Sequence, residues 1–321
     1  MGLRLARYRS AHDEGDGAWG VVAGDRLLPV PGCYPTTAAL LAKGVAAARA
    51  LAAPAASAAG EGLRLADLEL LAPVTHPCRI VAQGLNYRSH LDELGIRRRP
   101  PLVLFRKASA SLAGPHAAIP TPEGVRLLDY EVELGLVVGA PTRGPQAVDA
   151  QSLHRFVGAL VVANDVSARD LQIAEGQFYR SKSFPGFTPV GPWLYVPEPA
   201  ELARWAELRL TLRVNDEVRQ DASCGEMLYG PAEALTEITR IEDLDPGDLV
   251  LTGTPGGVAL RPPPPLVQRL AGLLGEERRF ALFLRGQLRR REYLRPGDRV
   301  RATIRTPDGA VDLGEQSCLV R

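Results

Sequence analysis

Apolar residues recur at every second position along several short stretches of the chain, which is the spacing of half-buried β-strands. Residues 208–214 alternate leucine and valine with polar residues and then reach Asn215-Asp216, a pair typical of hairpin turns. Three further stretches, LVLFRKA, EVELGLVVG and ALVVAND, have the length and apolar character of strands. The pattern therefore predicts a body that is rich in β-strands.

Helical segments are few. Residues 87–95, 167–175 and 231–241 have helix-like sequences, but strands and helices do not alternate as in a dinucleotide-binding fold. We therefore expect the α+β class. The chain divides into a small N-terminal α/β domain over residues 1–72 and a body over residues 73–321. Within the body, Pro-rich and then helix-like sequence at 261–292 interrupts the strands and predicts an excursion or insertion.

Composition and charge exclude several kinds of partner. The 321 residues carry a net charge of +1, so no global field favours nucleic acid or an anionic membrane. No stretch has the roughly 18 consecutive apolar residues of a membrane span, and the N-terminal sequence lacks an apolar signal core. The four cysteines lie far apart, which argues against a zinc knuckle. These features predict a cytoplasmic protein with reduced cysteines.

Two acidic residues stand out in the strand-like stretch at 131–139. Glu131 and Glu133 lie two positions apart, so both side chains should point to the same face of a strand. Asp165 follows the apolar stretch at 159–163 and adds a third carboxylate at a strand end. Three converging carboxylates would need compensation by one divalent cation and one lysine. Oxygen ligands alone suit Mg²⁺, Mn²⁺ or Ca²⁺ rather than zinc.

Each acidic residue also has a simpler interpretation. Glu131 and Glu133 could lie on the solvated face of an edge strand, and Asp165 could be a helix N-cap, a position that aspartate favours. From the residues alone these alternatives stay open.

Other candidate residues lie in three short segments. His90 and Glu93 would share one face of a helix, where a carboxylate can make an imidazole a better base. Lys182 is one of only three lysines and sits among small and turn-forming residues, and Thr254 lies in the Gly-rich turn of LTGTPGGV. A surface His–Glu pair, a loop lysine and an ordinary tight turn are the alternatives.

Six ordered motifs together resemble the fumarylacetoacetate hydrolase (fumarylacetoacetase) family, and the N-terminal strands resemble the small leading domain of bacterial members. The family patterns are G-x-N-Y-x-x-H-x-x-E, F-x-K-P, D-Y-E-x-E-L, D-x-(S/T)-A-R-D-x-Q, K-(S/G)-F and T-G-T-P-x-G. In this chain they occupy Gly84–Glu93, Phe105–Lys107, Asp129–Leu134, Asp165–Gln172, Lys182–Phe184 and Thr252–Gly257. The resemblance is close over residues 74–260 and looser over 293–321.

The resemblance implies roles for these residues. Glu131, Glu133 and Asp165 would be the ligands of Mg²⁺ or Mn²⁺, with Ca²⁺ as another possibility. His90 and Glu93 would activate water, and Lys182 would polarise the substrate beside the metal. The positions near the substrate or its supporting shell would be Lys107, Arg169, Gln172 and Thr254.

The resemblance further implies a mixed β-roll or barrel-like fold, a homodimer and a small 2-oxo or diketo acid as substrate. The first functional hypothesis is a metal-dependent hydrolase that cleaves a C–C bond of a 2,4-dioxo acid similar to an acylpyruvate or fumarylpyruvate, as in aromatic catabolism. The second is a decarboxylase, isomerase or lyase acting on an oxaloacetate-like or other 2-oxo acid. A metal-stabilised binding protein is the third.

The chain departs from the family patterns at two positions. Ala108 stands where the family has proline after Lys107, and Pro185 stands where the family has aspartate after Lys182–Phe184. The family pattern also assigns no role to the excursion at 261–292. The shape of the pocket is therefore expected to differ here.

Overall fold

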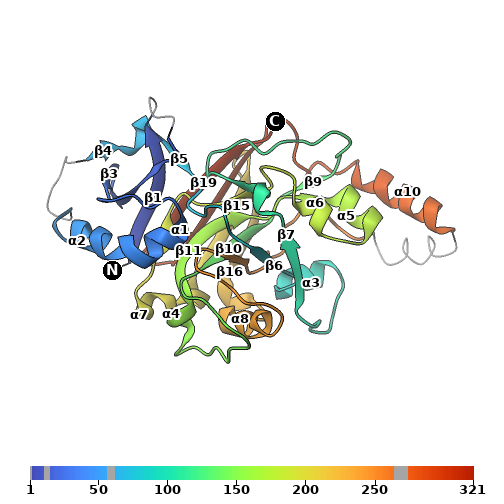
Figure 1. Ribbon diagram of the computed structural model, residues 1–321. Coiled ribbons are helices and arrows are strands. Elements are labelled where there is room, and N and C mark those ends of the chain that lie inside the picture. Colours follow the sequence, from blue (N-terminus) through green and yellow to red (C-terminus); the bar gives the residue numbers. More distant parts are fainter. Residues whose placement is uncertain (1, 11–14, 56–61, 264–273) are drawn as a thin grey trace.

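The computed structural model describes residues 2–10, 15–55, 62–263 and 274–321. The chain folds around a mixed sheet of 11 strands, most of which follow the order β4-β3-β2-β1-β14-β11-β10-β17-β6-β7, with β5 paired to β1 (Figure 1). This order runs from β4 to β7 without closing, so among the described residues the sheet is open and not a closed barrel. The predicted β-rich, mixed fold is otherwise confirmed.

The centre of this sheet is built from apolar strands. β10 (Val132–Val138) lies between β11 (Val157–Asn164) and β17 (Leu249–Leu251), antiparallel to both. On its other edge β17 pairs in parallel with β6 (Ile80–Gly84). β6 in turn pairs with β7 (Val103–Lys107), and these two strands are antiparallel. Every residue of β10 is buried, because neighbouring strands cover both of its edges and apolar side chains cover both faces.

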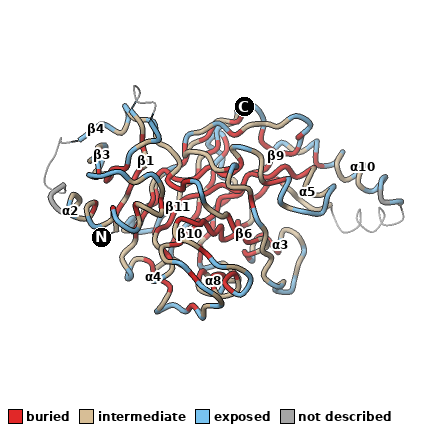
Figure 2. The backbone as a smooth tube through the Cα atoms, viewed as in Figure 1, coloured by how far each residue is buried: buried red, intermediate tan, exposed pale blue. Residues whose placement is uncertain are grey.

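A second sheet of four antiparallel strands packs against one face of β10. Its order is β16-β15-β18-β19, with bounds Glu217–Ser223, Arg209–Val214, Arg299–Arg305 and Asp312–Leu319. The alternating leucines of β15 are buried in one cluster with Val132, Leu134 and Leu136 of β10. The apolar side chains of the predicted alternation at 208–214 therefore form part of the core between the two sheets. Figure 2 shows this core as buried chain at the centre of the molecule.

The N-terminal residues extend the large sheet. β1 (Leu3–Ser10) pairs with β14 (Leu194–Val196), so a strand from the first residues joins one from the middle of the chain. The remaining strands of this part are β2 (Ala18–Ala23), β3 (Arg26–Pro29), β4 (Leu63–Arg64) and β5 (Leu68–Leu71). Helices α1 (Thr37–Ala39) and α2 (Val45–Ala55) lie on the same side of the molecule (Figure 1). The division between residues 72 and 73 stays a prediction.

The helices form where the sequence predicts them, although they are shorter. They are α3 (Arg88–Glu93), α5 (Arg169–Glu175) and α8 (Pro231–Thr239). In the excursion, α10 (Glu276–Gln287) extends from the end of the molecule opposite the N-terminal strands, and residues 264–273 lie outside the described part (Figure 1). No helix in the described residues is long and apolar enough to cross a membrane. Other short α-helices and strands are α4 (Leu153–Phe156), α6 (Tyr179–Lys182), α7 (Pro199–Leu202), β8 (Leu112–Ala113), β9 (Leu128–Asp129), β12 (Ser167–Ala168) and β13 (Thr188–Pro189).

Candidate metal centre and active site

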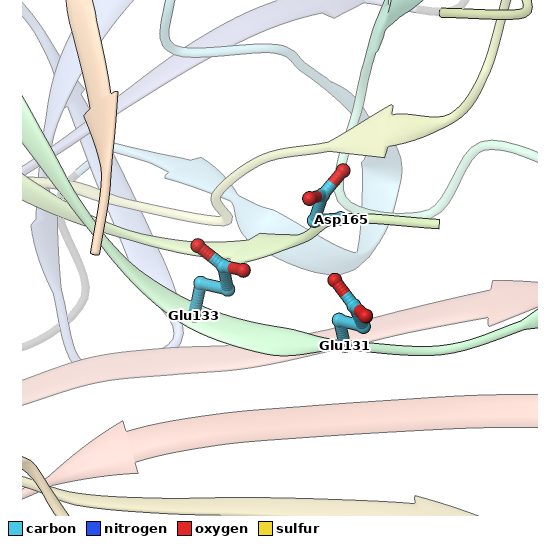
Figure 3. Close-up of side chains that lie close together, drawn as sticks. All are labelled: Glu131, Glu133 and Asp165. Atoms are coloured by element: carbon cyan, nitrogen blue, oxygen red, sulfur yellow. The ribbon is translucent and has the colours of Figure 1, made fainter. Parts of the chain in front are cut away.

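The three predicted metal ligands come together where β10 and β11 meet. Glu131 directly precedes β10, Glu133 lies within it, and Asp165 directly follows β11. One carboxylate oxygen from each residue lies within 4.8 Å of the others, and all three residues are buried (Figure 3). The group therefore offers three oxygen ligands to a single cation.

The backbone explains why these carboxylates converge. Val132 pairs with Asn164, and the Asp165 amide donates to the Glu131 carbonyl at 2.8 Å, so the antiparallel contact continues past the strand ends. Alternation along β10 sends Val132, Leu134, Leu136 and Val138 to one core and turns Glu133 and Val137 to the opposite face. The interpretation of Glu131 and Glu133 as a solvated edge is wrong, because β10 is a central strand.

The N-cap interpretation of Asp165 is also wrong. α5 begins at Arg169, and its N-cap is Ala168 with no side-chain hydrogen bond. Asp165 is fully buried and its carboxylate instead accepts hydrogen bonds from two lysines.

Lys182 bridges two of the three carboxylates. Its ammonium group donates to Glu131 Oε2 at 2.6 Å, Asp165 Oδ2 at 2.7 Å and Ser167 Oγ at 2.7 Å. The alternative of a surface loop lysine is wrong, since Lys182 is 2% exposed at the end of α6. Burial alone would lower the pKa of Lys182, but the charges of Asp165 and Glu131 outweigh it and raise that pKa.

Lys107 approaches the same centre from the end of β7. Its ammonium group donates to Asp165 Oδ1 and, at 2.8 Å, to the Phe187 carbonyl. The residue is 3% exposed, and burial lowers its pKa even though Asp165 acts in the opposite direction. Lys107 thus bonds one oxygen of Asp165 while Lys182 bonds the other.

Arg169 connects the centre to a fourth buried carboxylate. Its guanidinium donates to Glu131 Oε1, to Asp129 Oδ2 at 2.8 Å and to Gln172 Oε1 at 2.7 Å. Asp129 also accepts from the backbone amides of Ala259 and Leu260. Burial acts to lower the pKa of Arg169, but Glu131 and Asp129 raise it, so this cation stays charged.

Charge is distributed unevenly among the acidic residues. Burial alone would raise the pKa of Glu131, but Arg169 and Lys182 outweigh it and hold that pKa at about 2. Glu133 accepts a hydrogen bond from the Gly253 amide at 2.7 Å, and no lysine or arginine in the described residues forms an ion pair with it. Burial, followed by Asp165 and Glu131, raises the pKa of Glu133 well above its ordinary range.

The donor set fits a hard divalent cation. Four buried carboxylates, of which Glu133 has no cationic partner, face only three buried cations in this part of the structure. An isolated buried carboxylate is unfavourable, and a cation at the triad would be the cationic partner that Glu133 lacks. All three candidate ligand atoms are oxygens, which suits Mg²⁺, Mn²⁺ or Ca²⁺.

His90 and Glu93 lie on one face of α3, as the spacing predicts. His90 is buried, so a pair fully on the surface is wrong for the histidine. His90 Nδ1 is 3.9 Å from Glu93 Oε2, which is too long for a hydrogen bond, and it has no hydrogen-bond partner in the described residues. Glu93 instead accepts from the Gly257 amide at 2.8 Å and from Arg261 at 2.6 Å.

Thr254 lies in the turn that follows β17, beside the strand that carries Glu133. Its hydroxyl donates to the Val132 carbonyl at 3.0 Å and accepts from Gln220 Nε2 at 2.8 Å. Gln220 also bonds the Val132 amide and the Pro255 carbonyl. In this arrangement Thr254 fixes the turn at 252–257 against β10.

Sequence reasoning missed several residues of this site. Asp129 and Ser167 lie inside two of the quoted motifs, so their place in those motifs could have identified them as site residues. Gln220 and Arg261 lie outside every motif, in the hairpin strand β16 and at the start of the excursion. No pattern in the sequence distinguishes Arg261 from the other 34 arginines.

A model of the fumarylacetoacetate hydrolase C-terminal domain matches residues 79–320. The chain belongs to the fumarylacetoacetate hydrolase family. Among curated proteins, an uncharacterised protein of Staphylococcus aureus strain USA300 is 34% identical over 239 residues, which are 74% of this chain and 69% of the relative.

Solved structures of this family share the fold along nearly the whole chain. Fumarylacetoacetate hydrolase from Exiguobacterium antarcticum is 27% identical, with a TM-score of 0.71 and 99% of both chains covered. 2-Hydroxyhepta-2,4-diene-1,7-dioate isomerase from Mycobacterium marinum is 25% identical, with a TM-score of 0.69 and coverage of 99% of this chain and 98% of the isomerase. This protein is thus an enzyme of a superfamily whose members include a hydrolase and an isomerase.

Proposed function

We propose that this family member is a metal-dependent hydrolase that cleaves a C–C bond of a small 2,4-dioxo acid, similar to an acylpyruvate or fumarylpyruvate. The carrying observation is the buried Glu131, Glu133 and Asp165 group, in which Glu133 has no cationic partner among the described residues and which lies beside the ammonium group of Lys182. A bound Mg²⁺ or Mn²⁺ ion would supply Lewis-acid stabilisation of negative charge on the substrate oxygens.

Lys182 supplies a fixed positive charge next to the carboxylates. When the bond between C3 and C4 of a 2,4-dioxo acid breaks, its electron pair becomes the enolate of a pyruvate unit. A buried ammonium group stabilises such developing charge more strongly than one in water does. Lys107 and Arg169 hold Asp165 and Glu131 in place, while Gln172 and Thr254 are the proposed contacts to the substrate.

His90 is the proposed general base of hydrolysis. The imidazole takes a proton from water, and the water oxygen bonds to C4 as the C3–C4 bond breaks. Protonation of C3 then gives pyruvate and a carboxylic acid. Glu93 stabilises the imidazolium once the two side chains have come into contact.

The second candidate is a decarboxylase, isomerase or lyase that acts on an oxaloacetate-like or other 2-oxo acid. One observation favours it: His90 Nδ1 and Glu93 do not form a hydrogen bond in this structure. The similarity to a protein that is named as an isomerase is consistent with it. Such reactions use the same stabilised enolate without activated water.

The substitution His90→Ala separates the two candidates. We expect acylpyruvate hydrolysis to fall by at least about 100-fold, the usual contribution of general-base catalysis, while oxaloacetate decarboxylation is largely retained. The matched control is His116→Ala, which removes an exposed histidine. Both activities are measured with Mg²⁺ or Mn²⁺ present. Hydrolysis that survives in His90→Ala contradicts the role of His90.

We further propose that the enzyme is a cytoplasmic homodimer whose ligands are small acids, with no nucleic-acid or membrane partner. Its net charge of +1 supports the absence of a nucleic-acid or membrane partner. Light scattering at several protein concentrations tests the dimer, and a monomer at every concentration would contradict it.

A further inference from the structure

Glu93 has three neighbours that compete for its two oxygens. Oε1 accepts from the Gly257 amide at 2.8 Å, and Oε2 accepts from Arg261 Nη1 at 2.6 Å. The same Oε2 lies 3.9 Å from His90 Nδ1. The carboxylate that would orient the histidine is therefore held by an arginine from the start of the excursion.

The result for His90 is an unfavourable environment. Its Nδ1 is buried and lacks a hydrogen-bond partner among the described residues, while the separation of 3.9 Å between Nδ1 and the carboxylate is less than about 1 Å beyond hydrogen-bond distance. Buried polar atoms without a partner are rare in stable proteins. A small movement of Glu93 or Arg261 would satisfy the imidazole.

The backbone of Arg261 is held by a residue at the end of α10. Gln287 at the last position of that helix donates to the Arg261 carbonyl at 2.7 Å, and Tyr293 donates to Gln287 at 2.8 Å. Both Gln287 and Tyr293 are buried. The side chain of Arg261 is 31% exposed. It can therefore leave Glu93 for solvent or for an anion while the hydrogen bond from Gln287 to its backbone stays in place.

Glu93 also contacts the turn that follows β17. A Cβ at Gly256 would lie 2.9 Å from Glu93 Oε1, and Gly257 has φ +105°. Because the turn confines the carboxylate, contact with His90 depends on the partner at Oε2. That partner is Arg261.

We propose that Arg261 is a positioning residue that holds Glu93 away from His90, so that the His90–Glu93 pair forms only when the Arg261–Glu93 ion pair opens. This inference rests on the proposed function, because it assigns a resting and an active arrangement to the proposed base. In this proposal the described part of the excursion has a role, because it carries the arginine that controls the His90–Glu93 pair.

The two arrangements differ in where the neutral imidazole carries its proton. A hydrogen bond from Nδ1–H to Glu93 fixes the proton on Nδ1 and leaves the Nε2 lone pair free to accept a proton from water. Without that hydrogen bond, nothing on Nδ1 favours this tautomer. Opening the Arg261 ion pair therefore prepares His90 for its proposed role.

The test is ¹⁵N NMR of histidine-labelled protein at an alkaline pH where the imidazole is neutral. The chain has five histidines, and His90→Gln assigns the signal of His90. In Arg261→Met we expect the Nδ1–H tautomer of His90 to increase relative to wild type. Arg261→Lys keeps a cation for Glu93 and should resemble wild type. Arg285→Met, an exposed arginine of α10, is the matched control and should leave the signal unchanged.

Kinetics provide a second readout. Because the ion pair opens before the transition state, kcat/KM for hydrolysis should rise about fivefold in Arg261→Met, the factor that corresponds to one ordinary hydrogen bond. Gln287→Ala removes the hydrogen bond to the Arg261 carbonyl. It should increase the Nδ1–H tautomer of His90 and kcat/KM, as Arg261→Met does. A lower kcat/KM in Arg261→Met would overturn the inference.

The NMR measurement needs no turnover, so it separates this inference from the proposed function. An unchanged His90 tautomer in both Arg261→Met and Gln287→Ala overturns the positioning role, whatever the enzyme hydrolyses. A tautomer that shifts as expected supports it even if acylpyruvates are not substrates. Thermal unfolding of each variant confirms that the comparison is made between folded proteins.

Discussion

The ammonium group of Lys182 lies 2.6 Å from Glu131 Oε2, and both side chains are buried. The same ammonium group also bonds Asp165, so one lysine restrains two members of the candidate metal centre. Breaking a buried ion pair by removing one partner is strongly destabilising, because it leaves a buried charge without compensation. We therefore expect this contact to affect stability as well as the proposed chemistry.

Replacing Lys182 by methionine tests this double role. We expect the metal-free variant to lose about 3–5 kcal/mol of unfolding free energy. Part of this loss should be recovered with Mg²⁺ or Mn²⁺, since a cation at the triad compensates the same carboxylates. Urea unfolding with and without the ion measures both effects.

The control for that experiment is Lys43→Met, which removes an exposed lysine. We expect its stability to change by no more than about 0.5 kcal/mol. A Lys182→Met protein as stable as this control would contradict the importance of the buried contact.

The low pKa of Glu131 predicts how stability depends on pH. Burial would raise this pKa, but Arg169 and Lys182 hold it at about 2, below the ordinary value of 4.5. A carboxyl group with a lowered pKa stabilises the fold above its unfolded pKa, and this stabilisation is lost as the pH falls through the folded value. Between pH 4.5 and 2, metal-free wild type should therefore lose about 3 kcal/mol more than Glu131→Gln.

Urea unfolding at several pH values measures this difference. Wild type and Glu131→Gln differ in sequence only at this residue, so the difference between their pH dependences reports on the carboxyl group of Glu131. Glu315→Gln, which removes an exposed carboxylate on β19, should follow wild type. Equal slopes for wild type and Glu131→Gln would show that Glu131 has an ordinary pKa.

The segment at 87–100 is predicted to act as a lid over a bound ligand. It carries His90 and is fastened at its far end, where Arg99 stacks on Tyr229 at 3.8 Å and Tyr229 donates to the Pro100 carbonyl at 2.8 Å. We expect oxalate, a mimic of the enolate, to slow hydrogen exchange in this segment several-fold in the presence of Mg²⁺. Exchange at β15 serves as the internal reference, and an unchanged rate at 87–100 would contradict a lid.

Much of the centre could be predicted because local rules determine it. The alternation at 131–138 places Glu131 and Glu133 on one face, and the i, i+3 spacing of His90 and Glu93 places them on one side of a helix. These relationships depend on residues next to each other in the chain. The structure confirms both.

The position of β10 in the sheet could not be predicted in the same way. A central strand and an edge strand can show the same alternation, and the difference depends on β11 and β17, the latter more than 100 residues away in the chain. The contact between Arg261 and Glu93 likewise spans 168 positions. Long-range pairing of this kind leaves no periodic signal in a single sequence.

The central claim is that Glu131, Glu133 and Asp165 bind one divalent cation. Diffraction from crystals soaked in Mn²⁺, recorded at a wavelength where manganese scatters anomalously, tests it most directly. We expect one anomalous peak per chain, in bonding contact with a carboxylate oxygen of each residue. An anomalous map without a peak among these three carboxylates, at Mn²⁺ concentrations that support any activity of the enzyme, would contradict the claim.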